Sequence, residues 1–220
     1  MVIDENVRFD VDSSMALTII NPQVDYGDEK GKRFVKGVEN DKYNYPVEVV
    51  ISNIVKLISL PFGLRVCSTD MHTIDSNSAE VDEYGVHCLE KTPGIKLLHP
   101  VKVALADVSS LPLRKGQDPV VIGNSVALSP DFPSHIRMLR DKCVSKVFLC
   151  GLPFNSAVAM SAIEYMNQHL GAKNAGVYVI LDATRSDPPP RRDPKGLREC
   201  LEFFGVKFVF AHQLLGGKPK

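Results

Sequence analysis

The sequence predicts an α/β protein with three layers, in which helices cover both faces of a central parallel sheet of about six strands. Two observations predict this fold. Short apolar runs alternate along the chain with segments whose apolar residues recur at helical spacing. The apolar runs contain few polar positions, which is typical of parallel strands that are buried on both faces. In such sheets the functional site lies at the carboxyl ends of the strands.

Each expected strand is a short apolar run. The first is Met15–Ile20, which reads MALTII. The later runs are residues 64–68, the weaker 120–122, 146–150, 177–181 and 206–210. We expect the runs at 15–20, 64–68, 146–150 and 177–181 to be adjacent or nearly adjacent parallel strands, joined by right-handed crossovers.

The expected helices lie between these runs. Residues 46–60 carry apolar side chains at helical spacing, and Pro46 suits a first turn. Further helices are expected from Ser134, over 155–170 with Asn155 as its N-cap, and over 195–204. Two stretches are expected to be irregular: residues 27–45, which are polar, and residues 186–194, which are rich in proline.

Composition restricts the class of protein. The chain has 220 residues and a net charge of zero, from 26 basic and 26 acidic residues. One domain is expected over 1–220, with its core at about 15–215 and tails at 1–14 and 216–220. A neutral chain argues against non-specific binding of nucleic acid or of a membrane surface. No apolar stretch is long enough to span a membrane.

The expected compartment is intracellular and reducing, with the cytoplasm favoured. The first ten residues include three acidic ones and no apolar region, which argues against a secretory signal or a transit peptide. The five cysteines are odd in number and widely spaced, without a CxxC pair. This pattern indicates reduced thiols rather than disulfides or a cysteine zinc site.

A metal site is suggested by Asp70 and His72, which directly follow the second expected strand, together with His87. One carboxylate and two imidazoles suit Zn²⁺, Fe²⁺ or Mn²⁺. By itself this signal is weak, since an Asp and a His two residues apart are common on protein surfaces.

Three other polar positions fall at expected strand ends. Lys115 alone would be a solvated lysine, and Asn21 suits a turn. Residues 151–158 join a strand to a helix and include Ser156, but no histidine lies nearby in sequence to activate that hydroxyl.

Five segments carry a family resemblance when they are taken in order. They are NPQVDY at 21–26, DMH at 70–72, YGVHCLEKTPG at 84–94, KGQD at 115–118 and GLPFNSAV at 151–158. They resemble, in that order, the D-x-Q-N-D-F, D-W-H, W-P-x-H-C-x-x-x-T-x-G, K-G-x-D and G-L-A-T-D-x-C-V segments of the isochorismatase-like cysteine hydrolases, and nicotinamidases most closely. The resemblance spans about residues 15–215 and implies the three-layer fold of that family.

The resemblance also implies a binding site. It makes Asp70, His72 and His87 the metal ligands, with Zn, Fe or Mn as the ion, and in nicotinamidases this ion contacts the pyridine nitrogen of the substrate. Tyr26 takes the place of an aromatic residue near the ligand, and Pro153 and Ser156 lie in the turn that borders it. Met71 replaces a usual tryptophan, which implies a less aromatic pocket.

The departures from the family concern catalysis. The family uses an Asp, a Lys and a Cys, and here the corresponding residues are Asn21, Lys115 and Ala157. An amide cannot accept the thiol proton, and alanine supplies no nucleophile. Pro153 occupies the position after a cis peptide whose N–H holds the oxyanion, and proline has no N–H. We therefore expect a cis Leu152–Pro153 bond and a catalytically inactive protein.

The sequence thus predicts a pseudoenzyme that is retained as a metal-containing binding or interaction module. A protein partner or larger assembly is expected, and a small aromatic ligand and a homo-oligomer are further options. One alternative is an active hydrolase of nicotinamide-like amides or isochorismate-like ethers that uses another nucleophile, such as Ser156 or Cys150. The other alternative is a purely architectural subunit whose metal site is residual.

Overall fold

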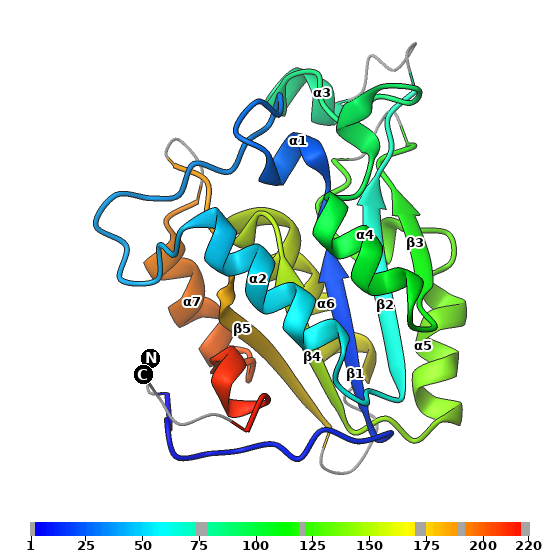
Figure 1. Ribbon diagram of the computed structural model, residues 1–220, viewed down its shortest axis with the longest axis vertical. Coiled ribbons are helices and arrows are strands. Elements are labelled where there is room, and N and C mark those ends of the chain that lie inside the picture. Colours follow the sequence, from blue (N-terminus) through cyan, green and yellow to red (C-terminus); the bar gives the residue numbers. More distant parts are fainter. Residues whose placement is uncertain (1–2, 74–78, 119–121, 170–174, 189–191, 217–220) are drawn as a thin grey trace.

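The computed structural model describes residues 3–73, 79–118, 122–169, 175–188 and 192–216. Its centre is a sheet of six parallel strands in the order β3-β2-β1-β4-β5-β6. The strands are β1 (Met15–Ile20), β2 (Leu64–Asp70), β3 (Leu111–Lys115), β4 (Lys146–Gly151), β5 (Gly176–Thr184) and β6 (Lys207–Val209). The predicted parallel sheet is confirmed, and Figure 1 shows it between its helices.

The four runs that we expected to be neighbours are β2, β1, β4 and β5, which lie side by side. Strand β1 is central, because Ile20 pairs with Ser68 of β2 and with Gly151 of β4. The weaker strand prediction at 120–122 is wrong for Ile122, which is not in a strand, and residues 120–121 lie outside the described part.

Strand β3 was not among the expected apolar runs, although Lys115 at its end was expected to lie at a strand end. It reads LPLRK, and only Leu113 and Lys115 are buried. Strand β3 forms one edge of the sheet and pairs with β2 alone. An edge strand tolerates Pro112 and exposed polar residues, so it lacks the continuous apolar run that marked the inner strands.

The helices are α1 (Val24–Gly27), α2 (Val47–Ile58), α3 (Ala79–Tyr84), α4 (His99–Ala106), α5 (Phe132–Asp141), α6 (Ala159–His169) and α7 (Pro194–Phe203). A π-helical turn, η3 (Phe154–Val158), leads directly into α6. Helices α2, α5, α6 and α7 correspond to the four that were predicted. Helices α1, α3 and α4 were not predicted, because each is short or carries only one or a few buried side chains.

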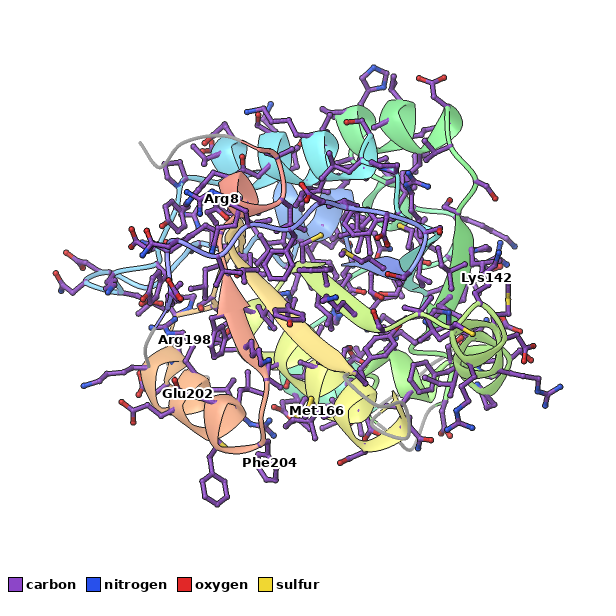
Figure 2. All side chains as sticks on the ribbon, turned by 90° about the horizontal axis from the view of Figure 1, so that it is seen from below. Arg8, Lys142, Met166, Arg198, Glu202 and Phe204 are labelled. Atoms are coloured by element: carbon purple, nitrogen blue, oxygen red, sulfur yellow. The ribbon has the colours of Figure 1, made fainter. Side chains whose placement is uncertain are left out.

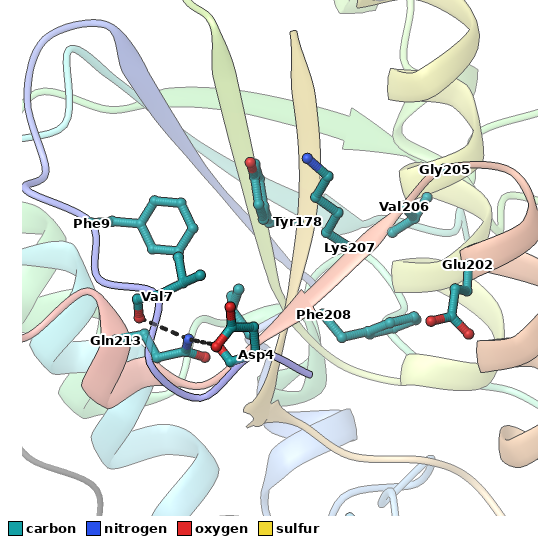
Figure 3. Close-up of a pocket in the computed structure, with 11 residues that line it drawn as sticks. Asp4, Val7, Phe9, Tyr178, Glu202, Gly205, Val206, Lys207, Phe208 and Gln213 are labelled. Carbon is teal, nitrogen blue, oxygen red and sulfur yellow. Dashed lines mark hydrogen bonds between the residues drawn. The ribbon is translucent and has the colours of Figure 1, made fainter. Parts of the chain in front are cut away.

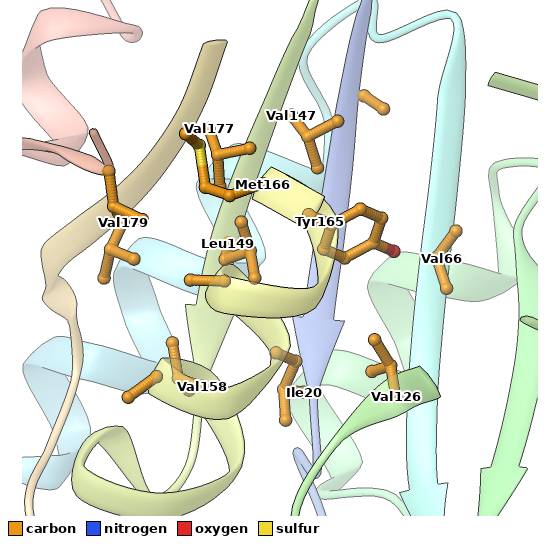
Figure 4. Packing of buried hydrophobic residues seen from close by; sticks show 14 of the residues in the cluster. Ile20, Val66, Val126, Val147, Leu149, Val158, Tyr165, Met166, Val177 and Val179 are labelled. Carbon is orange, nitrogen blue, oxygen red and sulfur yellow. The ribbon is translucent and has the colours of Figure 1, made fainter. Parts of the chain in front are cut away.

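Two apolar cores lie on opposite faces of the sheet. Leu17 and Ile19 of β1 belong to one core with α2 and α4, whereas Ala16 and Ile20 belong to the other with α5, α6 and α7. Every residue of β1 is buried, as the uninterrupted apolar run predicted. Figure 4 shows the second core, where valines of β4 and β5 face Tyr165 and Met166 of α6.

The amino-terminal segment, which was expected to be a tail, packs against the sheet. The ring of Phe9 lies 5.1 Å from that of Phe148 and 5.2 Å from that of Tyr178, measured between centroids. The backbone N–H of Phe9 donates to the carbonyl of Gln213 at 2.9 Å. This contact brings both ends of the described chain to the same side of the molecule (Figure 1).

Helix α7 runs along the outside of the sheet. Figure 2 labels Arg198 and Glu202 on this helix and Phe204 directly after its end. Phe203 is 88% exposed and Phe204 is 51% exposed. Within the described residues, no helix is both long enough and apolar enough to cross a bilayer.

Candidate functional site

The residues of interest meet at the carboxyl ends of the central strands. Asp70 ends β2 and Lys115 ends β3, and the two are paired in register. Asn21 directly follows β1, and Ala157 lies in η3. Figure 1 shows α1 and α3 beyond these strand ends, where they cover the site. The topology thus brings together residues that are far apart in the sequence.

Asp70 is the centre of a buried polar network. Its side chain is fully buried, and the ammonium of Lys115 donates to its Oδ1. The Nδ2 of Asn21 donates to its Oδ2 at 2.7 Å, and the Tyr26 hydroxyl donates to the same oxygen at 2.5 Å. Asn21 therefore acts as a hydrogen-bond donor to a carboxylate. An aspartate at this position would place a second negative charge beside Asp70.

His72 and His87 converge with a third residue, Glu80 of α3. One ligand atom of each lies within 4.8 Å of the others, and all three residues are buried. The Nε2 of His87 is 3.7 Å from Oε1 of Glu80, and the two imidazole rings are 4.7 Å apart between centroids. Two imidazoles and one carboxylate form a donor set that suits a divalent transition metal.

The hydrogen bonds of these two histidines leave ring nitrogens available to bind a metal. Nδ1 of His87 lies 2.7 Å from the carbonyl of Gly85, so a proton on Nδ1 leaves the Nε2 lone pair free. Among the described residues, neither ring nitrogen of His72 has a hydrogen-bond partner, although the residue is fully buried. A buried imidazole without partners is costly unless a ligand completes it. The geometry therefore fits a metal ion.

The backbone around His72 holds its ring in place. Its N–H donates to the carbonyl of Cys88, and its carbonyl accepts from the N–H of Glu90, which brings the His87 segment beside it. Gly116 has a φ of +80°, and a Cβ there would lie 2.8 Å from Cε1 of His72. Glycine is thus required at this position for the ring to fit.

The protonation states also favour metal binding. Burial opposes ionisation of Glu80, but the closeness of His87 and the charge of Lys115 outweigh it and hold the pKa of Glu80 at about 2. Burial lowers the pKa of His72, which favours the neutral imidazole that a metal needs. Gly123 links the two parts of the site, because its carbonyl accepts from Lys115 at 2.7 Å and its N–H donates to Glu80 at 2.6 Å.

Among the described residues, the carboxylate that lies with the two histidines is not the one that the family resemblance implies. The resemblance implies Asp70, whereas the side chains that converge are His72, Glu80 and His87. Both oxygens of Asp70 are already engaged by Lys115, Asn21 and Tyr26. Glu80 was missed because α3 is too short to show a helical pattern and no motif marks it. Its position between the two histidines in sequence is the only signal that could have indicated it.

The turn between β4 and α6 has the expected shape. The Leu152–Pro153 peptide bond is cis, as predicted. The prediction that Asn155 caps the helix is wrong: Pro153 is the N-cap of η3. Asn155 lies inside the turn and binds a distant loop instead, because its side chain donates to the carbonyls of Asp187 and Arg192 and accepts from the N–H of Asp187.

A small cavity lies between these groups. The centre of a water-sized sphere can occupy about 10 Å³ of this cavity, so there is room for about one water molecule. The predicted residues that line it are Asn21, Tyr26, Asp70, His87, Lys115, Pro153, Ser156 and Ala157. Arg33, Glu80, Tyr84 and Asn124 line it as well and were not among the predicted site residues. The cavity is too small for an organic ligand.

No cysteine provides a nucleophile in this cavity. Burial raises the pKa of Cys150 far above that of a free thiol, and its side chain belongs to the apolar core that includes α2 and does not line the cavity. Burial also raises the pKa of Cys88, and the charge of Asp70 adds to this effect. Ser156 is 8% exposed and faces the cavity without a hydrogen-bonded base among the described residues.

A larger pocket lies away from this site. It has a volume of about 400 Å³ and is formed by the amino-terminal segment, the start of β5 and edge strand β6 (Figure 3). Phe9, Tyr178 and Lys207 line it, and Gln213 holds its rim by donating to the carbonyls of Asp4 and Val7. The described residues that line it include no Cys, Ser, Thr or His. The chemistry-bearing residues therefore gather at the strand ends and not here.

Comparison with solved structures defines the class of fold. The PnC1 protein from L. infantum in complex with nicotinate superposes with a TM-score of 0.75 and 21% identity, over 94% of this chain and 98% of that one. The yeast nicotinamidase Pnc1p bound to nicotinaldehyde superposes with a TM-score of 0.72 and 17% identity, over 89% of this chain and 99% of that one. The pyrazinamidase of Pyrococcus horikoshii in complex with zinc superposes with a TM-score of 0.65 and 20% identity, over 90% of this chain and 99% of that one.

The chain therefore has the three-layer fold of the isochorismatase-like hydrolases, as the motifs predicted, and shares it with nicotinamidases. At this identity the likeness establishes the fold alone. No protein-family model matches the sequence, and no curated protein matches it either.

Proposed function

We propose that this protein is a catalytically silent relative of the nicotinamidase-type hydrolases, which holds one divalent metal ion and acts as a binding or structural module. The observation that carries this proposal is the Asn21–Asp70 hydrogen bond beside Ala157. At the position of the base there is a donor, and at the position of the nucleophile there is a methyl group. Neither group can generate or supply a thiolate.

Two further features support the loss of turnover. Pro153 has no N–H to offer an oxyanion, although the turn around it keeps a cis bond. The cavity admits about one water molecule, whereas an amide substrate such as nicotinamide needs a much larger space. Catalysis would therefore require both another group to stabilise the oxyanion and a wider cavity.

The metal-binding part of the proposal assigns the ion to His72, Glu80 and His87, with Zn, Fe and Mn as the ions that suit this donor set. The unpartnered nitrogens of His72 and the Gly85 contact of His87 support this assignment. When bound, the ion would act as a Lewis acid, and the chain's own residues would supply no nucleophile beside it. A zinc-bound pyrazinamidase of the same fold supports zinc as the first ion to test.

The metal assignment predicts a specific loss of zinc binding. His87→Ala is expected to lower the affinity for Zn²⁺ by about a hundredfold or more, because it removes one of three protein ligands. Isothermal titration of the apoprotein measures this change, and His99→Ala on the exposed start of α4 is the matched control. Equal affinity in the His87→Ala and His99→Ala proteins would contradict the assignment.

The same titration separates the two carboxylates. Glu80→Gln is expected to weaken zinc binding strongly, while Asp70→Asn is expected to act mainly on folding, because Asp70 is held by Lys115, Asn21 and Tyr26. A loss of affinity in Asp70→Asn that equals the loss in Glu80→Gln would instead favour the ligand set implied by the resemblance.

The alternative of an active amidohydrolase rests on Ser156. Its hydroxyl faces the cavity, and a serine can act as a nucleophile when a base lies beside it. His87 is the imidazole that lines the same cavity, but its nitrogens contact Gly85 and Glu80. The inactive module is therefore better supported, and a protein partner or assembly remains part of that proposal.

A further inference from the structure

Arg33 lines the small cavity and contacts two other segments of the chain. It belongs to the irregular segment between α1 and α2, and its N–H donates to the carbonyl of Asp25 at 3.0 Å. Its guanidinium pairs with the carboxylate of Asp187 at 2.6 Å. The same guanidinium lies 4.9 Å above the ring centroid of Tyr84 in α3. One side chain thus joins three segments that are distant in sequence.

Asp187, the partner of Arg33, is held in place by hydrogen bonds of its backbone. Asp187 lies in the loop after β5, and its backbone is fixed to Asn155 in both directions, by bonds of 2.8 and 2.9 Å. The side chain of Asp187 is 3% exposed and that of Arg33 is 12% exposed. Breaking a charge pair buried to this extent is unfavourable, because each charge would need a new partner or water.

Arg33, but not Asp187, lines one of two neighbouring spaces. The inner cavity holds about one water molecule, and a neighbouring pocket of about 180 Å³, called the outer pocket, adjoins it. Tyr84, Asn124 and Ser156 line both. Arg33 lines the inner cavity only, and its stacking on Tyr84 fixes one wall that the two spaces share.

We propose that the Arg33–Asp187 ion pair is a latch that seals the metal cavity, the inner cavity that Glu80 and His87 line, so that exchange of the ion and entry of small molecules both require the latch to open. This inference rests on the proposed metal site but extends it to access. It predicts that the outer pocket is the route of entry and that reagents reach His87 only during rare opening. Local opening of this kind is governed by the few contacts that must break.

The test removes one charge of the latch and measures access to His87 in the apoprotein. In Arg33→Met, modification of His87 by diethyl pyrocarbonate is expected to be faster by about tenfold or more, as followed by peptide mass analysis. Exposed His99 serves as the internal reference. Asp187→Asn should give the same acceleration, and Arg33→Lys, which keeps the charge, should give a smaller one.

A matched ion pair provides the control. Arg198 and Asp41 pair at 2.6 Å with 7% and 6% exposed side chains, and neither residue lines the metal cavity. Arg198→Met should leave the rate at His87 unchanged relative to His99. Equal rates at His87 in the wild-type, Arg33→Met and Asp187→Asn proteins would overturn the latch.

Metal release gives a second readout and separates the two proposals. From zinc-loaded protein, release to a chelator should be faster by about tenfold or more in Arg33→Met than in Arg198→Met. If zinc does not bind, the metal assignment fails, while the labelling of His87 still decides the latch. If zinc binds and is released at the same rate from both variants, the latch fails and the metal site stands.

Discussion

Replacing Lys115 by methionine is expected to lower the free energy of unfolding by about 3–5 kcal/mol, the usual cost of removing one partner of a buried ion pair. Lys115 is 1% exposed, and its ammonium contacts both the carboxylate of Asp70 and the carbonyl of Gly123. Without it, Asp70 remains a buried charge with only the neutral donors of Asn21 and Tyr26.

Urea denaturation of the apoprotein measures this loss. Lys102→Met, on the exposed face of α4, is the matched control and should change stability by less than about 0.5 kcal/mol. The double variant Lys115→Met with Asp70→Asn should lose less than the sum of the two single losses, since it leaves no uncompensated charge. A loss below about 1 kcal/mol in Lys115→Met would mean that the network does not stabilise the fold as described.

Restoring the two missing catalytic groups is expected to leave the protein inactive. Asn21→Asp with Ala157→Cys returns a carboxylate and a thiol, but Pro153 still withholds a backbone donor from the oxyanion. One such donor is worth about 2.7–4 kcal/mol, or about a hundred- to a thousandfold in rate. The cavity also keeps room for only about one water, with Arg33 in its wall.

The two remaining obstacles can be removed one at a time. Adding Pro153→Ala returns the donor, and adding Arg33→Ala widens the cavity. Ammonia release from nicotinamide is expected only when both are present, in protein whose circular dichroism shows that it is folded. The control carries the other three changes but retains Ala157. Turnover by the simple double variant would show that neither the donor nor the space limits the reaction.

Much of the fold could be predicted because the central strands are buried on both faces. Strands β1 and β4 read as continuous apolar runs, and the helices that pack over them show apolar residues at helical spacing. Edge strand β3 and helix α4 were not predicted, for the opposite reason. Each buries few side chains, so its sequence resembles that of a polar loop.

The site could be predicted where a motif marks it and not where tertiary structure creates it. Asn21, Lys115 and Ala157 follow from aligned segments, and the chain brings them to one cavity. Glu80 and Arg33 lie outside any motif, in a short helix and an irregular segment. Their positions depend on how α3 and the segment after α1 fold over the strand ends, which no local pattern encodes.

The measurement that tests the central claim most directly is ammonia release from nicotinamide and pyrazinamide by the wild-type protein loaded with zinc, iron or manganese. We expect a rate equal to that of the metal salt alone, because Ala157 supplies no nucleophile and Asn21 supplies no base. Ammonia release that rises with protein concentration and disappears in Ser156→Ala would contradict it, and would show that the site has acquired another nucleophile.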